Sequence, residues 1–323
     1  MDQPELQTVQ LDDIRLRVAL QGPVDGPVVL LCHGWPESWY SWRAQMAALA
    51  AAGWRAVAPD MRGYGGSDAP DSPEHYTQLH QVGDLVGLLK ALGASSAVLV
   101  GHDWGAPTVW HAALLRPDLF TAVVGMSVPF APPGRTDLLS ALDKQGISTF
   151  YMQYFQTPGV AEAELERDVA ASIRRIHYSG SGDAPAGASF GVLKPGAGFL
   201  DHSVDPGEQL PAWMSAQDLA YYIGEYSRTG FRGGMNWYRA IGRNTALLAP
   251  WRGAVIRQPS LFIAGERDGV LKFPAAKAQI ERFAQTLPGL RGCHILPGAG
   301  HWIQRERAAE VNALLLAFLH GLP

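Results

Sequence analysis

Short apolar runs alternate with amphipathic segments over the first 127 residues, and this alternation constrains the fold most. The apolar runs predict strands at 14–20, 28–32, 55–59, 97–100 and 122–126. Segments with helical spacing of apolar residues separate several of them, at 40–52, 79–92 and 106–115. Such a sequence is typical of an α/β protein with a mostly parallel sheet covered by helices on both faces.

The alternation stops after Pro129 and resumes near residue 260. Helical, aromatic segments lie in between, at 148–156, 160–176 and 215–229, and the Gly- and Pro-rich stretch 179–211 predicts a long irregular surface loop. Strands at 260–264 and 292–296 and a helix at 308–319 then complete the sheet. We therefore predict a core formed by residues 1–131 and 252–323, with a helical cap inserted at 132–251.

Composition excludes several classes of partner. The chain has 323 residues, of which 47% are hydrophobic, so it can bury a large core. A net charge of -4 with interspersed charges gives no footprint for nucleic acid or an anionic membrane, and no apolar run reaches the roughly 18 residues of a membrane span. We expect a small-molecule partner; a homodimer stays open.

The first residues and the cysteines indicate in which cellular compartment the protein is found. The first ten residues are polar and lack the pattern of a secretory signal. Cys32 and Cys293 lie in apolar strand-like runs without metal-ligand spacing, so we expect two buried, reduced thiols. These features predict a cytoplasmic protein.

The strand at 97–100 runs into the sequence GHDWG and then directly into a helix. Gly101 and Gly105 allow a cramped bend, called a nucleophile elbow, that presents the side chain of Asp103 above the sheet beside a helix N-terminus. Serine usually holds this place. A carboxylate is ionised at neutral pH and displaces a leaving group at an sp3 carbon without a base to activate it. Taken alone, Asp103 could equally be a helix cap.

Two further residues follow predicted strands in the order that hydrolases with such an elbow use, first the acid and then the histidine. Asp268 follows the strand at 260–264, and His301 lies in a glycine-rich turn after the strand at 292–296. Either residue alone would be weak support, because surface loops often carry acids and histidines. Their joint order with Asp103 predicts a catalytic triad.

A loop with the sequence HGWPESWYSWR follows the strand at 28–32. Such a loop directs a backbone N–H toward the nucleophile, so we assign the oxyanion hole to the N–H groups of Trp35 and Trp104. We assign the support of this loop to His33, Gly34 and Pro36.

Four motifs together resemble the soluble epoxide hydrolase family, and the likeness runs along nearly the whole chain. They are HGWPESWYSWR at 33–43, RGYGGSD at 62–68, GHDWGAP at 101–107 and GHWIQ at 300–304. The resemblance implies an α/β-hydrolase fold whose cap supplies two tyrosines. These carry over to Tyr151, placed relative to the segment YFQTPG, and to Tyr238 in NWYR. Aromatic residues around Tyr151 are also spaced like a packed helix face, and Tyr154 is the alternative candidate.

The resemblance further implies a reaction in two steps. Asp103 attacks the epoxide and forms a covalent ester, while Tyr151 and Tyr238 bind and protonate the epoxide oxygen. His301, supported by Asp268, then activates water, which hydrolyses the ester to a vicinal diol. Water is the co-substrate. No cofactor and no metal are implied, because the sequence has neither a ligand cluster nor a phosphate-binding glycine loop.

Other functions share parts of this pattern. A haloalkane or haloacid dehalogenase also uses an Asp nucleophile with an acid and a histidine, and Trp104 could contact halide, but it does not need the cap tyrosines. A non-catalytic receptor on the same fold would bind an epoxide or lipid without forming product. An ordinary esterase would want serine at position 103. The aromatic insertion predicts a bulky apolar substrate, whereas the preferred epoxide, its enantiomer and the attacked carbon stay open.

Overall fold

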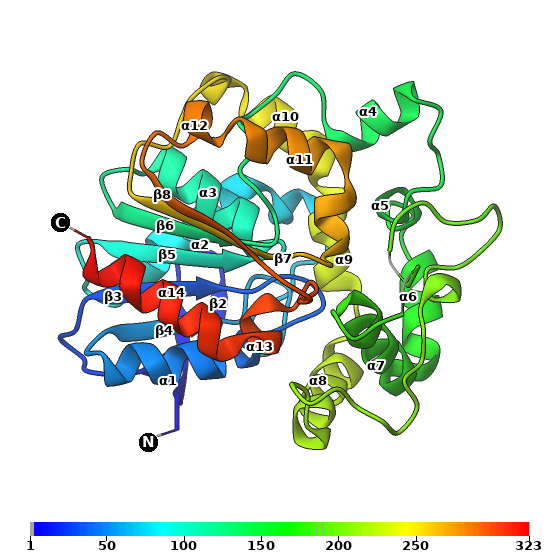
Figure 1. Ribbon diagram of the computed structural model, residues 1–323, viewed down its shortest axis with the longest axis horizontal. Helices are drawn as coiled ribbons and strands as arrows, with labels where there is room; N and C mark the ends of the chain where they lie inside the picture. The colour runs from blue at the N-terminus through cyan, green and yellow to red at the C-terminus, as the bar shows by residue number, and fades with distance from the viewer. Residues whose placement is uncertain (1–2, 186, 189, 323) are drawn as a thin grey trace.

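A computed structural model of the protein describes residues 3–185, 187–188 and 190–322. Within them, eight strands form one sheet in the order β1-β2-β4-β3-β5-β6-β7-β8, parallel from β4 to β8 and antiparallel at the β1-β2 edge (Figure 1). The strands span β1 (Glu5–Gln10), β2 (Arg15–Gln21), β3 (Val28–Cys32), β4 (Arg55–Pro59), β5 (Ala97–His102), β6 (Phe120–Met126), β7 (Ser260–Gly265) and β8 (Leu290–Leu296).

Helices cover both faces of this sheet, as the sequence predicts. Alternate residues of β3 enter two different cores: Val29 and Leu31 pack with α1 and α14, whereas Val28 and Leu30 pack with α2 and α3. The two layers lie on opposite sides of the sheet in Figure 1. The helices and 3₁₀ turns (η) outside the insertion are η1 (Trp39–Trp42), α1 (Arg43–Ala51), η2 (Pro73–Tyr76), α2 (Gln78–Ala91), α3 (Gly105–Leu115), η6 (Gly269–Lys272), α11 (Pro274–Glu281), α12 (Phe283–Thr286), α13 (Ile303–Glu306) and α14 (Ala308–His320).

The two edge strands are where the sequence-based expectations fail. The prediction lacks β1, because all of its side chains are exposed or half-buried and give no apolar signal. At the other edge, β8 alternates between exposed and half-buried residues. Cys293 is exposed on this strand, so the prediction of a buried thiol is wrong there, while Cys32 in the central strand β3 is buried. An edge strand has only one neighbour, which leaves much of its surface open.

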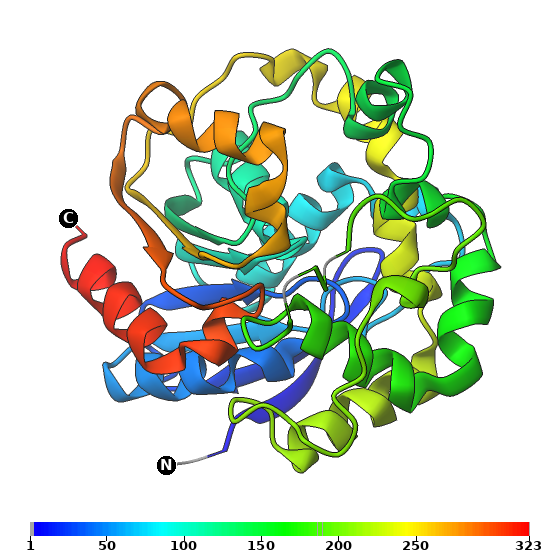
Figure 2. The same ribbon diagram turned by 45° about the vertical axis from the view of Figure 1, so that its right-hand side comes forward.

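The segment between β6 and β7 is helical and lies beyond one end of the sheet (Figures 1 and 2). The helix predicted at 160–176 is two helices, because the Asp168 carboxylate accepts a hydrogen bond from the Ala171 N–H and starts a new one. The boundaries 132 and 251 stay a prediction. The helices are α4 (Leu138–Lys144), α5 (Tyr151–Tyr154), α6 (Val160–Leu165), η3 (Glu166–Asp168), α7 (Val169–Gly180), η4 (Leu200–His202), α8 (Ala216–Thr229), α9 (Arg232–Arg239), α10 (Ile241–Leu247) and η5 (Ala249–Trp251).

The stretch 179–211 is mostly irregular, as predicted, but part of it is not at the surface. Residues 186 and 189 of this stretch lie outside the described residues. Phe199 is fully buried, with its ring 5.7 Å from that of Trp35, and Leu193 in the same loop is also buried. The loop therefore turns apolar side chains inward, and the prediction of a surface loop is wrong for them.

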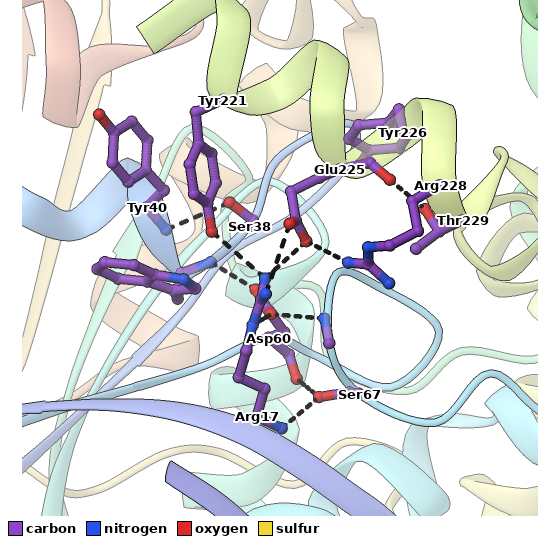
Figure 3. A network of polar contacts seen from close by, with 12 residues as sticks. Arg17, Ser38, Tyr40, Asp60, Ser67, Tyr221, Glu225, Tyr226, Arg228 and Thr229 are labelled. Carbon is purple, nitrogen blue, oxygen red and sulfur yellow. Dashed lines mark hydrogen bonds and ion pairs between the residues drawn. The ribbon is translucent and has the colours of Figure 1, made fainter. Parts of the chain in front are cut away.

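A network of charged groups joins the insertion to the sheet (Figure 3). Arg17 of β2 donates from Nε to Asp60 Oδ2 at 2.5 Å and from Nη2 to Glu225 Oε2 of α8 at 2.6 Å. The hydroxyl of Tyr221, also on α8, accepts a third bond from Nη2 at 3.3 Å. Asp60 in turn accepts a hydrogen bond from the Trp39 N–H at 3.0 Å. One arginine thus ties the end of β4 to the cap helix α8.

None of the helices in the described part of the chain combines the length and the apolar character that crossing a membrane requires.

Candidate active site

The bend after β5 is a tight, strained turn that presents Asp103. Asp103 has a φ of 51°, a left-handed conformation that is uncommon for a residue with a side chain. A Cβ atom on Gly101 would lie 2.3 Å from the Gly105 carbonyl oxygen, and one on Gly105 would lie 2.0 Å from the Cys32 carbonyl oxygen. Only glycine fits at both flanks, so the two glycines of the GHDWG sequence make the turn and α3 can start directly behind it.

The carboxylate of Asp103 lies against the loop that follows β3. Its Oδ1 accepts a hydrogen bond from the backbone N–H of Trp35 at 2.7 Å. Gly34 must lack a side chain, since a Cβ there would lie 2.1 Å from the same oxygen. Trp104 immediately precedes α3, and none of the hydrogen bonds found among the described residues joins its N–H to Asp103. Trp35 therefore fills one half of the predicted oxyanion hole in this state.

His33, Gly34 and Pro36 form the buried part of this loop, and the Trp35–Pro36 peptide bond is cis. Nδ1 of His33 donates to the Gly34 carbonyl oxygen at 2.9 Å, and Nε2 accepts from the Met61 N–H at 2.9 Å. Burial lowers the pKa of His33, which keeps the ring neutral in this pattern. The ring thus holds the loop to the segment after β4 and faces no cavity of its own.

His301 and Asp268 come from the ends of β8 and β7 and meet beside Asp103. Nε2 of His301 lies 3.4 Å from Asp103 Oδ2, and Nδ1 lies 3.1 Å from Asp268 Oδ1. Burial alone would lower the pKa of His301, but the charge of Asp268 and the contact with Asp103 raise it well above its ordinary value. Asp268 is itself buried and accepts a hydrogen bond from the Val270 N–H at 2.9 Å. One imidazole therefore connects the two carboxylates.

The two predicted tyrosines lie on different cap helices and line the same cavity as Asp103. Tyr151 begins α5 and Tyr238 lies near the end of α9, with ring centroids 6.1 Å apart. Burial, followed by nearby negative charge, raises the pKa of each phenol, so both keep their protons at neutral pH. Tyr154, the alternative candidate, donates its hydroxyl to Glu164 Oε2 at 2.8 Å and is committed to that partner.

The cavity over Asp103 holds about 640 Å³ of empty space, including its mouth. Apart from a small number of polar groups, its wall is largely apolar and aromatic, a composition suited to an apolar ligand. The lining residues beyond the triad and the two tyrosines are Trp35, Ile176, Ser179, Gly180, Ala188, Phe190, Phe199, Arg267, Gly269, Val270, Phe273 and Trp302.

A buried polar network below the triad is missing from the sequence-based prediction. His102, next to the nucleophile, contacts the His301 carbonyl oxygen through Nε2 at 2.7 Å and Glu37 Oε2 through Nδ1 at 2.8 Å. Gln304 Nε2 donates to Glu37 Oε1 at 3.0 Å. Burial raises the pKa of Glu37, but its polar and cationic partners outweigh burial and hold the pKa low. Glu37 and Gln304 do lie within the HGWPES and GHWIQ sequences, which is the signal that could have identified them.

Ser127 and Arg267 are also missing from the prediction. Ser127 Oγ lies 3.0 Å from His301 Nδ1, on the side of the ring that Asp268 contacts. Arg267 lines the cavity and donates to the backbone carbonyl oxygens of Gly182 and, at 2.7 Å, Ala184. A single serine after a strand and an arginine before an acid form no recognisable sequence pattern, so only the structure reveals these contacts.

Comparison with known proteins gives consistent results. A family profile described as the alpha/beta hydrolase fold matches residues 27–175. Epoxide hydrolase A of Mycobacterium tuberculosis is 46% identical over 324 residues, which cover 100% of this chain and 99% of the relative. An epoxide hydrolase of Caballeronia sordidicola is 45% identical over 312 residues, covering 96% of this chain and 92% of the relative.

Solved structures agree with this comparison. An epoxide hydrolase from an endophytic Streptomyces superposes with a TM-score of 0.92 at 44% identity, covering 99% of this chain and 96% of that chain. Epoxide hydrolase A from Mycobacterium thermoresistibile also gives a TM-score of 0.92, at 45% identity and 99% coverage of both chains.

Proposed function

This chain belongs to the epoxide hydrolase family of the α/β-hydrolase fold, and we propose that it opens its substrate by direct attack of the Asp103 carboxylate on a ring carbon. Its function is the conversion of an epoxide and water to a vicinal diol. One observation carries the mechanism. An unesterified carboxylate lies on a strained turn at the floor of an apolar cavity, with a histidine on one side and two buried phenols lining the same cavity.

In the first step, Asp103 Oδ2 forms a bond to an epoxide carbon as the bond from that carbon to the ring oxygen breaks. The electron pair moves to the ring oxygen, which takes a proton from Tyr151 or Tyr238. An alkoxide is a poor leaving group in water, and a phenol is acidic enough to protonate it as it forms. Oδ1, which accepts the Trp35 N–H, becomes the carbonyl oxygen of the resulting ester.

In the second step, His301 Nε2 takes a proton from water, and the hydroxide attacks the carbonyl carbon of the ester. The charge that develops on Oδ1 is held by the Trp35 N–H, and we assign the second donor to the Trp104 N–H. Collapse of this intermediate breaks its bond to the substrate oxygen, which takes the proton of the added hydroxyl group, so that the diol leaves and the carboxylate returns. The proton on His301 restores the tyrosine. Asp268 orients the imidazole and stabilises its charged form.

Trapping the ester tests this mechanism. His301→Gln removes the base and leaves Asp103 intact, so styrene oxide should add its full mass to the variant and the mass should map to the peptide that contains Asp103. The control His301→Gln/Asp103→Asn should gain no mass. An unmodified His301→Gln protein that still turns over, or an adduct on another residue, would contradict the proposal.

The aromatic wall of the cavity supports a bulky apolar epoxide as substrate. The cap at 132–251, a cytoplasmic location and a homodimer all rest on the sequence alone and stay predictions.

A further inference from the structure

A second strained turn lies beside the nucleophile elbow, where β6 ends. Ser127 has a φ of 68°, and Asp103 and Ser127 are the two residues other than glycine with a positive φ in the part of the chain that the structure describes. The Val128 N–H donates to the Met126 carbonyl oxygen at 2.8 Å, which closes a three-residue γ-turn with Ser127 at its centre. A γ-turn with a positive φ is rare and costly for a residue that carries a side chain. Such strain persists at sites where it serves a function.

The surrounding structure fixes this turn from two sides. The Ser127 N–H donates to the Ile263 carbonyl oxygen of β7 at 2.9 Å. The indole N–H of Trp110, on α3, donates to the Val128 carbonyl oxygen at 3.1 Å. Ser127 itself is fully buried. The backbone bonds therefore determine the direction of the serine side chain, which is toward His301.

The Ser127 hydroxyl completes the hydrogen bonding of the triad. Its Oγ is 3.0 Å from His301 Nδ1, almost the same as the 3.1 Å that separates this nitrogen from Asp268 Oδ1. When Nδ1 carries the proton and Nε2 faces Asp103, the Nδ1–H is shared by both acceptors. The serine hydrogen then needs an acceptor of its own, and Asp268 Oδ2 is buried with no partner among the hydrogen bonds of the described residues.

The electrostatics of Asp268 agree with this arrangement. Burial by itself raises the pKa of Asp268, but the charge and hydrogen bond of His301, a hydrogen bond from Ser127 and the Val270 N–H together lower it. Ser127 therefore faces both members of the pair: its oxygen lies within hydrogen-bond distance of the imidazole, and its hydrogen is available to the unpartnered Asp268 Oδ2.

We propose that Ser127 is a positioning residue that holds the His301 imidazole with Nδ1 protonated and Nε2 directed at the ester on Asp103. The inference rests on the proposed function, because it assigns Ser127 to the half of the reaction that activates water. Two acceptors on one N–H define the plane of the ring, whereas a single acceptor leaves the ring free to turn about that bond. Ring opening needs no base, so this step does not depend on Ser127.

Two substitutions separate the hydroxyl from the turn. Ser127→Ala removes the hydroxyl and keeps the strained backbone, and Ser127→Gly removes the hydroxyl while relieving the strain. Single-turnover fluorescence of the tryptophans with styrene oxide resolves ester formation from ester hydrolysis. Both variants should hydrolyse the ester about tenfold more slowly than the parent, as expected for the loss of one hydrogen bond in the transition state, and form it at a rate within about twofold.

A structural role for the turn would give a different result. In that case Ser127→Ala, which keeps the strained backbone, would match the parent in both steps and only Ser127→Gly would be impaired, which would overturn the proposal. Unchanged hydrolysis in both variants would do the same. Ser127→Gly also keeps the test decisive if Ser127→Ala does not fold.

Nitrogen NMR of the His301 ring gives a readout that does not depend on turnover. The measurement uses an Asp103→Asn background, which removes the Asp103 charge as the ester does, so that the pKa of His301 falls. With Ser127 in place this background should show one tautomer, protonated at Nδ1, and both Ser127 variants should show a mixture; a single unchanged tautomer in the variants would overturn the proposal. If the parent forms no ester on Asp103, the proposed mechanism fails at its first step, and the tautomer measurement still decides whether Ser127 positions His301.

Discussion

The two tyrosines that line the cavity are held in different ways. Tyr238 lies on α9, which packs directly on the core: a Cβ on Gly233 would lie 2.0 Å from the Gly63 carbonyl oxygen. The indole of Trp237, next to Tyr238, donates to the Arg62 carbonyl oxygen at 2.9 Å. Tyr238 thus has a position set by the same framework that holds Asp103.

Tyr151 instead belongs to the irregular side of the cap. It starts the four-residue helix α5, and its N–H donates to the Gly191 carbonyl oxygen at 2.9 Å. Phe150 pairs with Val192 in an isolated bridge. Tyr151 is therefore held by the loop that follows α7, and not by the sheet. From this difference we predict that Tyr238 keeps one distance to the nucleophile, whereas Tyr151 follows the loop and adapts to the substrate.

The largest effect should come from removing both phenols. Tyr151→Phe/Tyr238→Phe should lower the rate of ester formation about 1,000-fold, because no acid remains to meet the ring oxygen. Of the single variants, Tyr238→Phe should slow styrene-type and stilbene-type epoxides alike, and Tyr151→Phe should slow them unequally. Single-turnover rates measure both. The same dependence on substrate in the two single variants would remove the distinction between the tyrosines.

The contact between α9 and the core can be broken directly. Gly233→Ala places a methyl group against the Gly63 backbone, which cannot move aside, and should lower the free energy of unfolding by about 2 kcal/mol. The control is Gly224→Ala on α8, where nothing lies within 4 Å of the new Cβ. This change should raise stability by about 0.5 to 1 kcal/mol. Urea unfolding distinguishes them, and equal effects would show that α9 is not held by close packing.

The core and cap should also differ in their response to pH. The raised pKa values of both tyrosines keep them protonated, so ester formation should be flat from about pH 6 to 9. Ester formation removes the charge of Asp103, one of the groups that raise the pKa of His301, so that this pKa falls and the ring becomes a base. Below this lowered pKa of His301, the rate of ester hydrolysis should decrease about tenfold per pH unit.

Removing Asp268, the second charge near His301, tests the direction of the pH dependence of ester hydrolysis. Asp268→Asn eliminates a group that raises the pKa of His301, and therefore the acid limb of ester hydrolysis should move to lower pH. Single-turnover hydrolysis rates at a series of pH values provide the measurement. If the acid limb of ester hydrolysis moved to higher pH, or if the rate of ester formation showed such a limb, the titrating group would lie on the cap.

The smallest effect is expected on the loop that accompanies Tyr151. Phe190 lines the cavity, where its ring stacks on Phe199 at 4.4 Å. Phe190→Ala should therefore remove about 1 kcal/mol of aromatic contact with a bound aryl epoxide, or about fivefold in KM. Val192→Ala, at an exposed position in the same loop, is the control and should leave KM unchanged. An unchanged KM in both variants would argue against an adaptable side of the cavity.

Sequence reasoning worked where local pattern and tertiary structure agree. The apolar run of β5 and its two glycines predict the elbow, because a sharp turn after a buried strand leaves no alternative to small residues. Asp268 and His301 follow for the same reason, since parallel strands end at one edge of the sheet and bring their loops together. Side-chain direction in the cap has no comparable rule. Tyr151 and Tyr154 share a helix of one turn, and the choice between them depends on Glu164, ten residues away.

Other features left no signal at all. The side chains of β1 are exposed or half-buried, so its pairing with β2 is invisible in the residue pattern. Ser127 is one serine after a strand. Its position depends on the bond that its N–H donates to Ile263 and on the bond that Trp110 donates to Val128, and Ile263 and Trp110 lie far apart in the sequence. Long-range contacts of this kind decide orientation, and single-sequence reasoning does not reach them.

The contact of Gly233 with Gly63 is made by main-chain atoms, so it does not depend on the side chains that surround it. A chimera that takes the segment 137–215 from another family member would cross no part of this contact. Exchange of that segment should thus alter the range of accepted epoxides and leave the Tyr238 side of the reaction chamber in register, which places a crossover point for recombination just before α8.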